Sequence, residues 1–73
     1  MIAKIWTKPK CSYCYMAKML FDQHNISYEE VLLTESNREE FLRDSPHATT
    51  VPQILLDNIL VGGYTDLVAR LKG

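Results

Sequence analysis

The sequence is 73 residues long, about half of the length typical of one domain, and 47% of its residues are hydrophobic and 23% charged. This composition is that of an ordinary globular domain and excludes a disordered chain, a collagen-like repeat and a disulfide scaffold. Eight basic and nine acidic residues give a net charge of −1, so we expect one domain over residues 1–73 that binds neither nucleic acid nor an anionic membrane.

The first two expected elements are a strand and a helix. Residues 2–6 alternate apolar and polar side chains up to Trp6 and precede a Lys-Pro-Lys break, which is typical of a strand and its exit. Helical spacing then predicts a helix over residues 12–24, closed by Asn25. The residues expected on its buried face are Ala17, Leu20, Phe21 and His24.

A second strand and a short helix are expected next. Residues 27–33 have the pattern of a strand, whose expected buried residues are Tyr28, Val31 and Leu33. Ser36-Asn37-Arg38-Glu39 fits a capping box and predicts a helix up to about Asp44, ended by Ser45-Pro46. The residues expected to face the core from this helix are Phe41 and Leu42.

The last third of the chain predicts a hairpin and a helix. Two apolar runs, residues 53–56 and 59–61, are separated by Asp57-Asn58, which has the length and residue types of a hairpin turn. A helix over residues 64–71 is expected after Gly62-Gly63. The order β-α-β-α-β-β-α predicts an α/β fold with one right-handed parallel crossover and an antiparallel pair, giving a mixed four-stranded sheet flanked by three helices.

The small number of cysteines and the short apolar stretches indicate the cellular compartment of the protein. The longest apolar stretches, such as Met19-Leu20-Phe21, are far shorter than a secretory or membrane-spanning segment, so we expect a cytoplasmic protein. A secreted domain of this size would carry several disulfides, whereas this chain has only Cys11 and Cys14. A Cys-x-x-Cys pair in a reducing compartment indicates redox or metal chemistry.

The position of Cys11 favours its thiolate, the form that attacks disulfides. Cys11 lies at the first turn of an expected helix, where it faces the positive end of the macrodipole and unpaired backbone N–H groups. Lowering its pKa by about three units takes about 4 kcal/mol, of which the helix terminus supplies roughly 0.3 to 2 and a solvated lysine at most about 1. Backbone N–H···S bonds must supply the rest.

The same argument assigns different roles to the two cysteines. Cys14 lies one turn inside the expected helix, so we expect it to be less exposed and to have a pKa closer to the ordinary value of about 8.5. Cys11 is therefore expected to attack and Cys14 to resolve. Residues at i and i+3 share a helix face, which brings the two sulfur atoms within reach of a disulfide.

Cys11 and Cys14 could instead bind a metal or be buried and inert. Half of a zinc site is disfavoured because His24 and His47 do not complete a tetrahedral set at the usual spacing, and we expect no metal site. A buried, inert pair is disfavoured by its basic and tyrosine-flanked setting. Four further residues are interpreted as core or surface filler without a cofactor role: Trp6, Met16, Met19 and His24.

The sequence resembles the glutaredoxin family over almost its whole length, through three separated motifs. These are Thr7-Lys8-Pro9-Lys10-Cys11-Ser12-Tyr13-Cys14, Thr49-Thr50-Val51-Pro52-Gln53-Ile54 and Gly62-Gly63-Tyr64-Thr65-Asp66-Leu67. The resemblance implies a thioredoxin-like fold with a cis Val51-Pro52 peptide bond. It also implies a glutathione-dependent thiol–disulfide oxidoreductase in which Cys11 and Cys14 are catalytic.

The resemblance further implies a glutathione-binding site. Lys8 is expected to meet the glycyl carboxylate and Tyr13 to flank the cleft. The middle of the ligand is expected to be held by Thr50, Val51 and Pro52, and its γ-glutamyl end by Gly63, Tyr64, Thr65 and Asp66. Two of these residues also fit a purely structural role. Pro52 could be an ordinary proline at the start of a strand, and Asp66 could be an acidic residue at a helix N-terminus that pairs with Arg70.

The sequence departs from the family pattern at two positions. Ser12 replaces the proline common between the two cysteines, so the family's reduction potential does not carry over. Ala48 stands where an arginine often precedes the Thr-Val-Pro segment and would hold the glycyl carboxylate. Arg43 or His47 could take its place, or no residue does.

The resemblance fits more than one activity. The leading hypothesis is a monomer with no permanently bound cofactor, with glutathione as co-substrate and disulfide-containing or glutathionylated proteins, ribonucleotide reductase among them, as partners. A redoxin recharged by thioredoxin reductase is disfavoured because Gly63 to Asp66 resemble a glutathione site. An iron–sulfur module, in which two copies share a cluster through Cys11 and two glutathiones, is kept open by Ser12.

Overall fold

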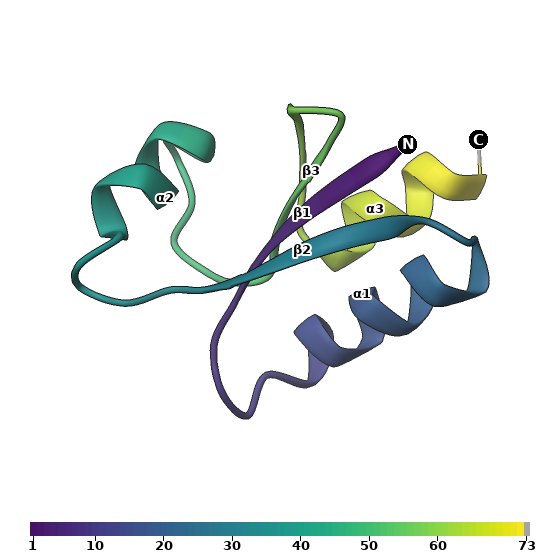
Figure 1. The fold of residues 1–73 in the computed structure, drawn as a ribbon, viewed down its shortest axis with the longest axis horizontal. Helices are drawn as coiled ribbons and strands as arrows, with labels where there is room; N and C mark the ends of the chain where they lie inside the picture. The colour runs from purple at the N-terminus through teal and green to yellow at the C-terminus, as the bar shows by residue number, and fades with distance from the viewer. Residues whose placement is uncertain (73) are drawn as a thin grey trace.

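A four-stranded sheet of order β2-β1-β3-β4 forms the centre of the fold (Figure 1). The computed structural model describes residues 1–72, and Gly73, the last residue of the predicted domain, lies outside the described residues. Strand β1 pairs with β2 in parallel and with β3 antiparallel, and β3 pairs with β4 antiparallel. The predicted element order and mixed sheet are confirmed. The elements are β1 Ile2–Thr7, α1 Ser12–Gln23, β2 Ser27–Leu32, α2 Arg38–Asp44, β3 Gln53–Leu56, β4 Ile59–Gly62 and α3 Tyr64–Lys72.

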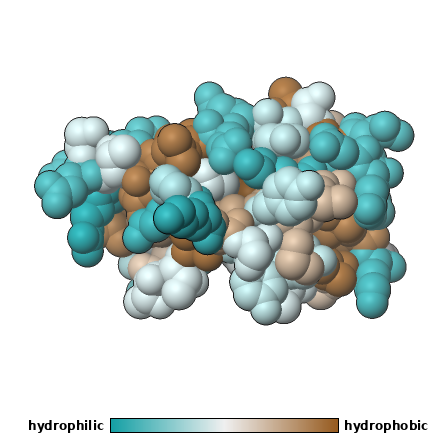
Figure 2. Space-filling view, turned by 90° about the horizontal axis from the view of Figure 1, so that it is seen from below, coloured by the Kyte–Doolittle hydropathy of each residue, from teal (hydrophilic) through white to brown (hydrophobic). Residues whose placement is uncertain are grey.

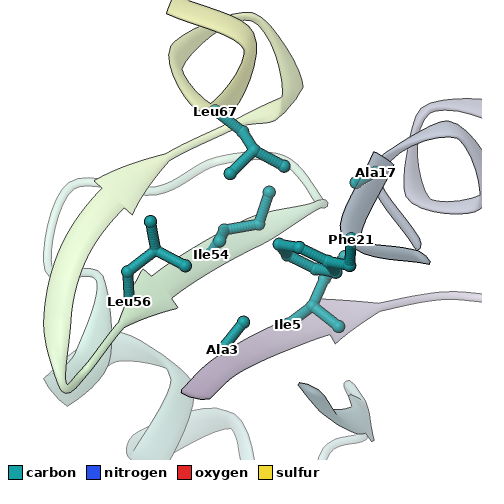
Figure 3. Packing of buried hydrophobic residues seen from close by; sticks show 7 residues of the cluster. All are labelled: Ala3, Ile5, Ala17, Phe21, Ile54, Leu56 and Leu67. Atoms are coloured by element: carbon teal, nitrogen blue, oxygen red, sulfur yellow. The ribbon is translucent and has the colours of Figure 1, made fainter. Parts of the chain in front are cut away.

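Helices cover both faces of the two central strands, whose side chains alternate between the faces. Under α1 and α3 lies the main core, in which no residue is more than 3% exposed (Figure 3): Ala3, Ile5, Ala17, Phe21, Ile54, Leu56 and Leu67. On the opposite face, α2 packs Phe41 against Trp6, with the two ring centroids 5.4 Å apart and Leu55 beside them. Because both faces are covered, every residue of β3 is buried.

The hairpin between β3 and β4 turns at the predicted residues. Asp57 and Asn58 have φ angles of 50° and 68°, which is the left-handed pair that a two-residue type I′ turn requires. Asp57 also joins the turn to the start of β1, since it donates its N–H to the Ile2 carbonyl at 2.8 Å and accepts from the Ile2 N–H at 2.9 Å. No helix within residues 1–72 has the length and apolar character needed to cross a membrane.

The predicted capping box at the start of α2 is wrong. Asn37 directly precedes the helix, and its side chain makes no capping hydrogen bond. It instead accepts from the Thr34 N–H at 2.8 Å and donates to the Leu32 carbonyl at 2.9 Å. The hydroxyl of Ser36 lies 2.9 Å from that of Thr34. These polar side chains therefore close the loop after β2, and do not cap the helix.

Several predictions of burial also need correction. His24 is exposed because α1 ends at Gln23, one residue before it. Leu42 is 38% exposed, since the two turns of α2 direct only Phe41 into the core. Strand β2 lies at the edge of the sheet, so Tyr28 and Val31, which were expected to be buried, are half-buried. Leu33 was expected to be a buried residue of the same strand, but it lies just after β2 and is also half-buried.

Asp44, the last residue of α2, ties this helix to β1. Its Oδ2 accepts hydrogen bonds from the Trp6 indole N–H at 2.9 Å and from the Lys4 ammonium at 2.8 Å. Burial by itself raises the pKa of Asp44, but the hydrogen bonds from Lys4 and Trp6, together with nearby positive charge, outweigh it and hold the pKa below its ordinary value. The carboxylate is therefore a charged tether between the two elements.

We expect Asp44→Asn to lower the free energy of unfolding at pH 7 by about 1 to 2 kcal/mol, because it weakens two charge-assisted hydrogen bonds. The folded-state pKa lies below the reference value of 3.8, so the stabilisation is present above that pH and is lost as the pH falls through the folded-state pKa. Urea unfolding at pH 7 and at about pH 3 measures it.

The matched control is Asp22→Asn, which removes an exposed carboxylate from α1 and is expected to change stability by less than about 0.5 kcal/mol. The wild type and Asp44→Asn should approach the same stability at acid pH. A difference between them that is equal at both pH values would contradict the charged tether.

Candidate active site

Cys11 and Cys14 form a disulfide at the start of α1, with their Cα atoms 5.2 Å apart. Cys11 is the N-cap of the helix: its backbone is extended, at φ −105° and ψ 105°, and its Sγ accepts a hydrogen bond from the Cys14 N–H at 3.2 Å. Cys11 is half-buried, whereas Cys14 is 2% exposed, as predicted. The sulfur that substrates can reach is thus the one at which a backbone N–H points.

The loop before β3 lies against this sulfur. The Val51–Pro52 peptide bond is cis, and the Val51 carbonyl oxygen is 3.9 Å from Cys11 Sγ. The buried side chain of Gln53 holds the loop, since it donates to the Thr50 carbonyl at 3.0 Å and accepts from the Ser45 hydroxyl at 2.9 Å. Sequence reasoning missed this anchor, because Ser45 and Gln53 meet only once α2 packs beside β3.

A hollow of about 330 Å³ lies beside the loop and brings together all the predicted glutathione-binding residues except Lys8. The ring of Tyr13, which is 57% exposed, lies 5.8 Å from that of Tyr64 between their centroids. Gln53 joins the lining as a residue that was not predicted. The predicted residues in this lining are Tyr13, Thr50, Val51, Pro52, Gly63, Tyr64, Thr65 and Asp66.

Asp66 shapes the far end of this hollow. Its Oδ2 accepts a hydrogen bond from the Gly63 N–H at 3.0 Å, which satisfies a backbone donor at the start of α3. Gly62 has a φ of 119°, and a Cβ on it would lie 2.5 Å from the same carboxylate oxygen, so only glycine fits. Among the described residues, Asp66 forms no ion pair with Arg70.

Lys8 lines a second hollow, of about 540 Å³, which shares Thr50 and Val51 with the first and extends towards α2. Neither Arg43 nor His47 lines it. Arg38, the first residue of α2, does. It was missed because the eleven residues between it and the Thr-Val-Pro segment give no local signal, and only the packing of α2 brings it into the same hollow as Lys8.

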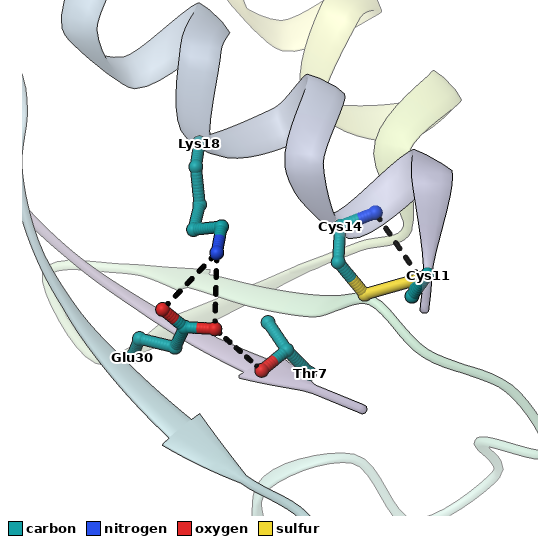
Figure 4. Close-up of polar contacts among 5 residues, drawn as sticks. All are labelled: Thr7, Cys11, Cys14, Lys18 and Glu30. Carbon is teal, nitrogen blue, oxygen red and sulfur yellow. Dashed lines mark hydrogen bonds and ion pairs between the residues drawn. A yellow bond between two sulfur atoms is a disulfide. The ribbon is translucent and has the colours of Figure 1, made fainter. Parts of the chain in front are cut away.

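A third hollow, of about 520 Å³, contacts the other flank of the cysteine pair, where its lining includes Cys14, Lys18 and Glu30. The Glu30 carboxylate accepts from the Lys18 ammonium at 3.1 and 3.2 Å and from the Thr7 hydroxyl at 2.8 Å (Figure 4). The hydrogen bond from Thr7, aided by Lys18, outweighs burial and holds the pKa of Glu30 below its ordinary value.

The outer face of α1 is partly apolar. Tyr15, Met16 and Met19 are 62%, 40% and 45% exposed. The view from the α1 side in Figure 2 shows hydrophobic and hydrophilic side chains side by side on this face. Trp6, by contrast, is fully buried in the core. No group of three His, Cys, Asp or Glu side chains in the described part of the chain has the arrangement of a metal site.

Comparisons with known proteins agree with this geometry. The family model for glutaredoxin matches residues 3–61. Glutaredoxin 1 of Rickettsia prowazekii is 46% identical over 66 residues, which are 86% of this chain and 70% of that protein. Glutaredoxin 3 of Escherichia coli strain K12 is 40% identical over 68 residues, which are 90% of this chain and 81% of that protein.

A solved structure agrees as well. The crystal structure of glutaredoxin 1 from Francisella tularensis, complexed with cacodylate, superposes with a TM-score of 0.81 at 32% identity and covers 97% of this chain and 92% of that one. The chain spans 64% and 61% of the length of two further Rickettsia relatives that it matches. The chain therefore belongs to the glutaredoxin family of thiol–disulfide oxidoreductases.

Proposed function

We propose that this protein uses glutathione to reduce protein disulfides and glutathione mixed disulfides. The observation that carries the proposal is the sulfur of Cys11 at a helix N-terminus, 3.9 Å from the carbonyl oxygen of Val51. Val51 and Thr50 line two adjoining hollows, one of which contains Asp66 and the other Lys8 and Arg38. A Cys-x-x-Cys pair explains disulfide exchange with any thiol. The two adjoining hollows, with an acidic residue in one and two basic residues in the other, are what favours glutathione, a tripeptide with a cysteine in its middle and charged groups at both ends.

Cys11 is the nucleophile in this proposal. Its thiolate attacks the glutathione sulfur of a mixed disulfide, forms a Cys11–glutathione disulfide and releases the protein thiolate, which takes up a proton. A second glutathione thiolate then attacks that disulfide, so Cys11 is regenerated and glutathione disulfide leaves. With a protein disulfide, Cys14 displaces the product from Cys11, and two glutathiones reduce the resulting Cys11–Cys14 disulfide.

The hollow that contains Asp66 offers partners for the cysteinyl and γ-glutamyl parts of glutathione. The Val51 backbone beside Cys11 can pair in strand fashion with the cysteinyl unit, and Thr50 and Pro52 flank it. At one end, the Asp66 carboxylate faces the γ-glutamyl ammonium, while the first turn of α3 at Tyr64 and Thr65 offers N–H groups to its carboxylate.

The glycyl carboxylate of glutathione lies at the opposite end in this proposal. Lys8 and Arg38 both line the hollow that continues from Thr50 and Val51 towards α2. Arg38 therefore takes the place of the arginine that the family pattern has at the position of Ala48. Two cations at this end also suit the second carboxylate of the tripeptide, and a peptide without a free carboxylate there would bind less tightly.

The first test separates the two cysteines. Cys11→Ser is expected to abolish reduction of a glutathionylated peptide with glutathione as the sole reductant, because no nucleophile remains. Cys14→Ser is expected to spare much of this reduction, because glutathione itself can resolve the mixed disulfide. The coupled turnover assay is repeated with thioredoxin reductase as the sole reductant. Equal loss in both variants would refute the roles, and turnover of the wild type with thioredoxin reductase but not with glutathione would refute glutathione dependence.

The second test addresses the glycyl carboxylate. Arg38→Gln is expected to raise the KM for a glutathionylated peptide about two- to fivefold and to leave kcat unchanged, as expected for one exposed ion pair. Arg43→Gln makes the same charge change on α2 at a residue outside the hollow. Equal changes in KM for the two variants would show that Arg38 acts only through the overall charge.

A further inference from the structure

We propose that Glu30 controls the resolving cysteine by occupying the Lys18 ammonium, which would otherwise stabilise the thiolate of Cys14. The inference rests on the proposed role of Cys14 as the resolving thiol. Glu30 and Lys18 are positioning residues in this account, because neither touches the reacting sulfur atoms. The pair makes the two thiols unequal, with Cys11 reactive and Cys14 kept mostly as a neutral thiol, also after a mixed disulfide has formed at Cys11.

The ion pair has a defined geometry. The Lys18 ammonium donates to both oxygens of the Glu30 carboxylate, at 3.2 and 3.1 Å. One of these oxygens also accepts from the Thr7 hydroxyl at 2.8 Å, and Thr7 is 1% exposed on β1. Thr7 therefore holds the carboxylate in place from the sheet, and the carboxylate holds the lysine.

Lys18 is placed to act on Cys14. The two residues are at i and i+4 on α1, so they are neighbours on one helix face. Figure 4 shows both side chains pointing from α1 towards the strands, with the Glu30 carboxylate beneath the ammonium. All three residues line the same hollow, whose other charged or titratable side chains are Lys8, Lys10, Cys11 and Tyr15.

The charges decide what the lysine does. Glu30 remains a carboxylate at neutral pH, because the Thr7 hydrogen bond and the Lys18 charge hold its pKa low. Because the ammonium and the carboxylate lie only 3.1 to 3.2 Å apart, their opposite charges act against each other on any group further away. A free Lys18 would favour the Cys14 thiolate, whereas a free Glu30 would disfavour it, so the two residues oppose each other.

The consequence concerns the lifetime of the glutathione mixed disulfide. In the closing step, the Cys14 thiolate attacks Cys11 Sγ, the Cys11–glutathione bond breaks, and the departing glutathione thiolate takes up a proton. A Cys14 thiol that stays protonated slows this step. The mixed disulfide at Cys11 then survives long enough for a second glutathione to reduce it directly.

The experiment measures Cys14 alone. In the Cys11→Ser background, the ¹³Cβ chemical shift of Cys14 is followed by NMR across pH. Glu30→Gln, which keeps an acceptor for Thr7, is expected to increase the acid dissociation constant of Cys14 about three- to tenfold, and Lys18→Gln to decrease it by a similar factor. The double variant Lys18→Gln/Glu30→Gln is expected to lie close to the starting protein.

Glu29→Gln is the matched control, because it removes the same charge from the neighbouring residue of β2, which is exposed and makes no ion pair within the described residues. The inference is overturned if Glu30→Gln shifts the titration no more than Glu29→Gln does, or if the two single variants shift it in the same direction. If Glu30→Gln fails to fold, the test is Lys18→Gln, which must decrease the acid dissociation constant of Cys14 by more than Glu29→Gln changes it; an equal or smaller change overturns the inference.

A kinetic measurement links the titration to function. In the protein with both cysteines, glutathionylated at Cys11, Glu30→Gln is expected to speed release of glutathione about two- to threefold at pH 7, since a lower thiol pKa adds thiolate but weakens each nucleophile. An unchanged or slower release would contradict the inference. The titration needs no glutathione, so an absence of glutathione turnover would defeat the proposed function and leave this result standing.

Discussion

The hydrogen bond from the Cys14 N–H to Cys11 Sγ is the interaction on which the rest of the site depends. It exists because Cys11 is the N-cap of α1, where backbone donors have no partner within the helix. Strand β1 and the loop after it deliver Cys11 to this position, and the core beneath α1 keeps the helix there. A cysteine within a strand would have neither the unpaired N–H group of a helix N-terminus nor the helix dipole to stabilise its thiolate.

Three polar anchors outside the cysteine pair give the site its shape, each on a different side of it. Gln53 fixes the cis-proline loop against α2, and Asp66 fixes the start of α3 to the glycine pair. Glu30 on β2 joins Thr7 of β1 to Lys18 of α1. Each anchor uses a side chain to satisfy a backbone group or a charge, so a small domain obtains a defined ligand surface without a large core.

Local sequence patterns predicted the helices, strands and fold well, but they could not predict contacts between residues that are far apart in the sequence. The hairpin at Asp57-Asn58 and the helix after Cys11 follow from residue types within a few positions. The capping box failed because Asn37 bonds backwards to the loop after β2, a choice that the four-residue motif does not reveal. Arg38 and the Lys18–Glu30 pair depend on how α2 and α1 pack on the sheet, which no spacing in the sequence encodes.

The most direct test of the account is the rate at which iodoacetamide alkylates Cys11 in the Cys14→Ser variant, measured across pH. This variant keeps the backbone N–H at position 14 and leaves a single thiol. We expect half of the maximal rate at a pH well below the value of about 8.5 typical of a free cysteine. A midpoint no lower than that of Cys11 in an unstructured peptide would contradict the stabilised thiolate.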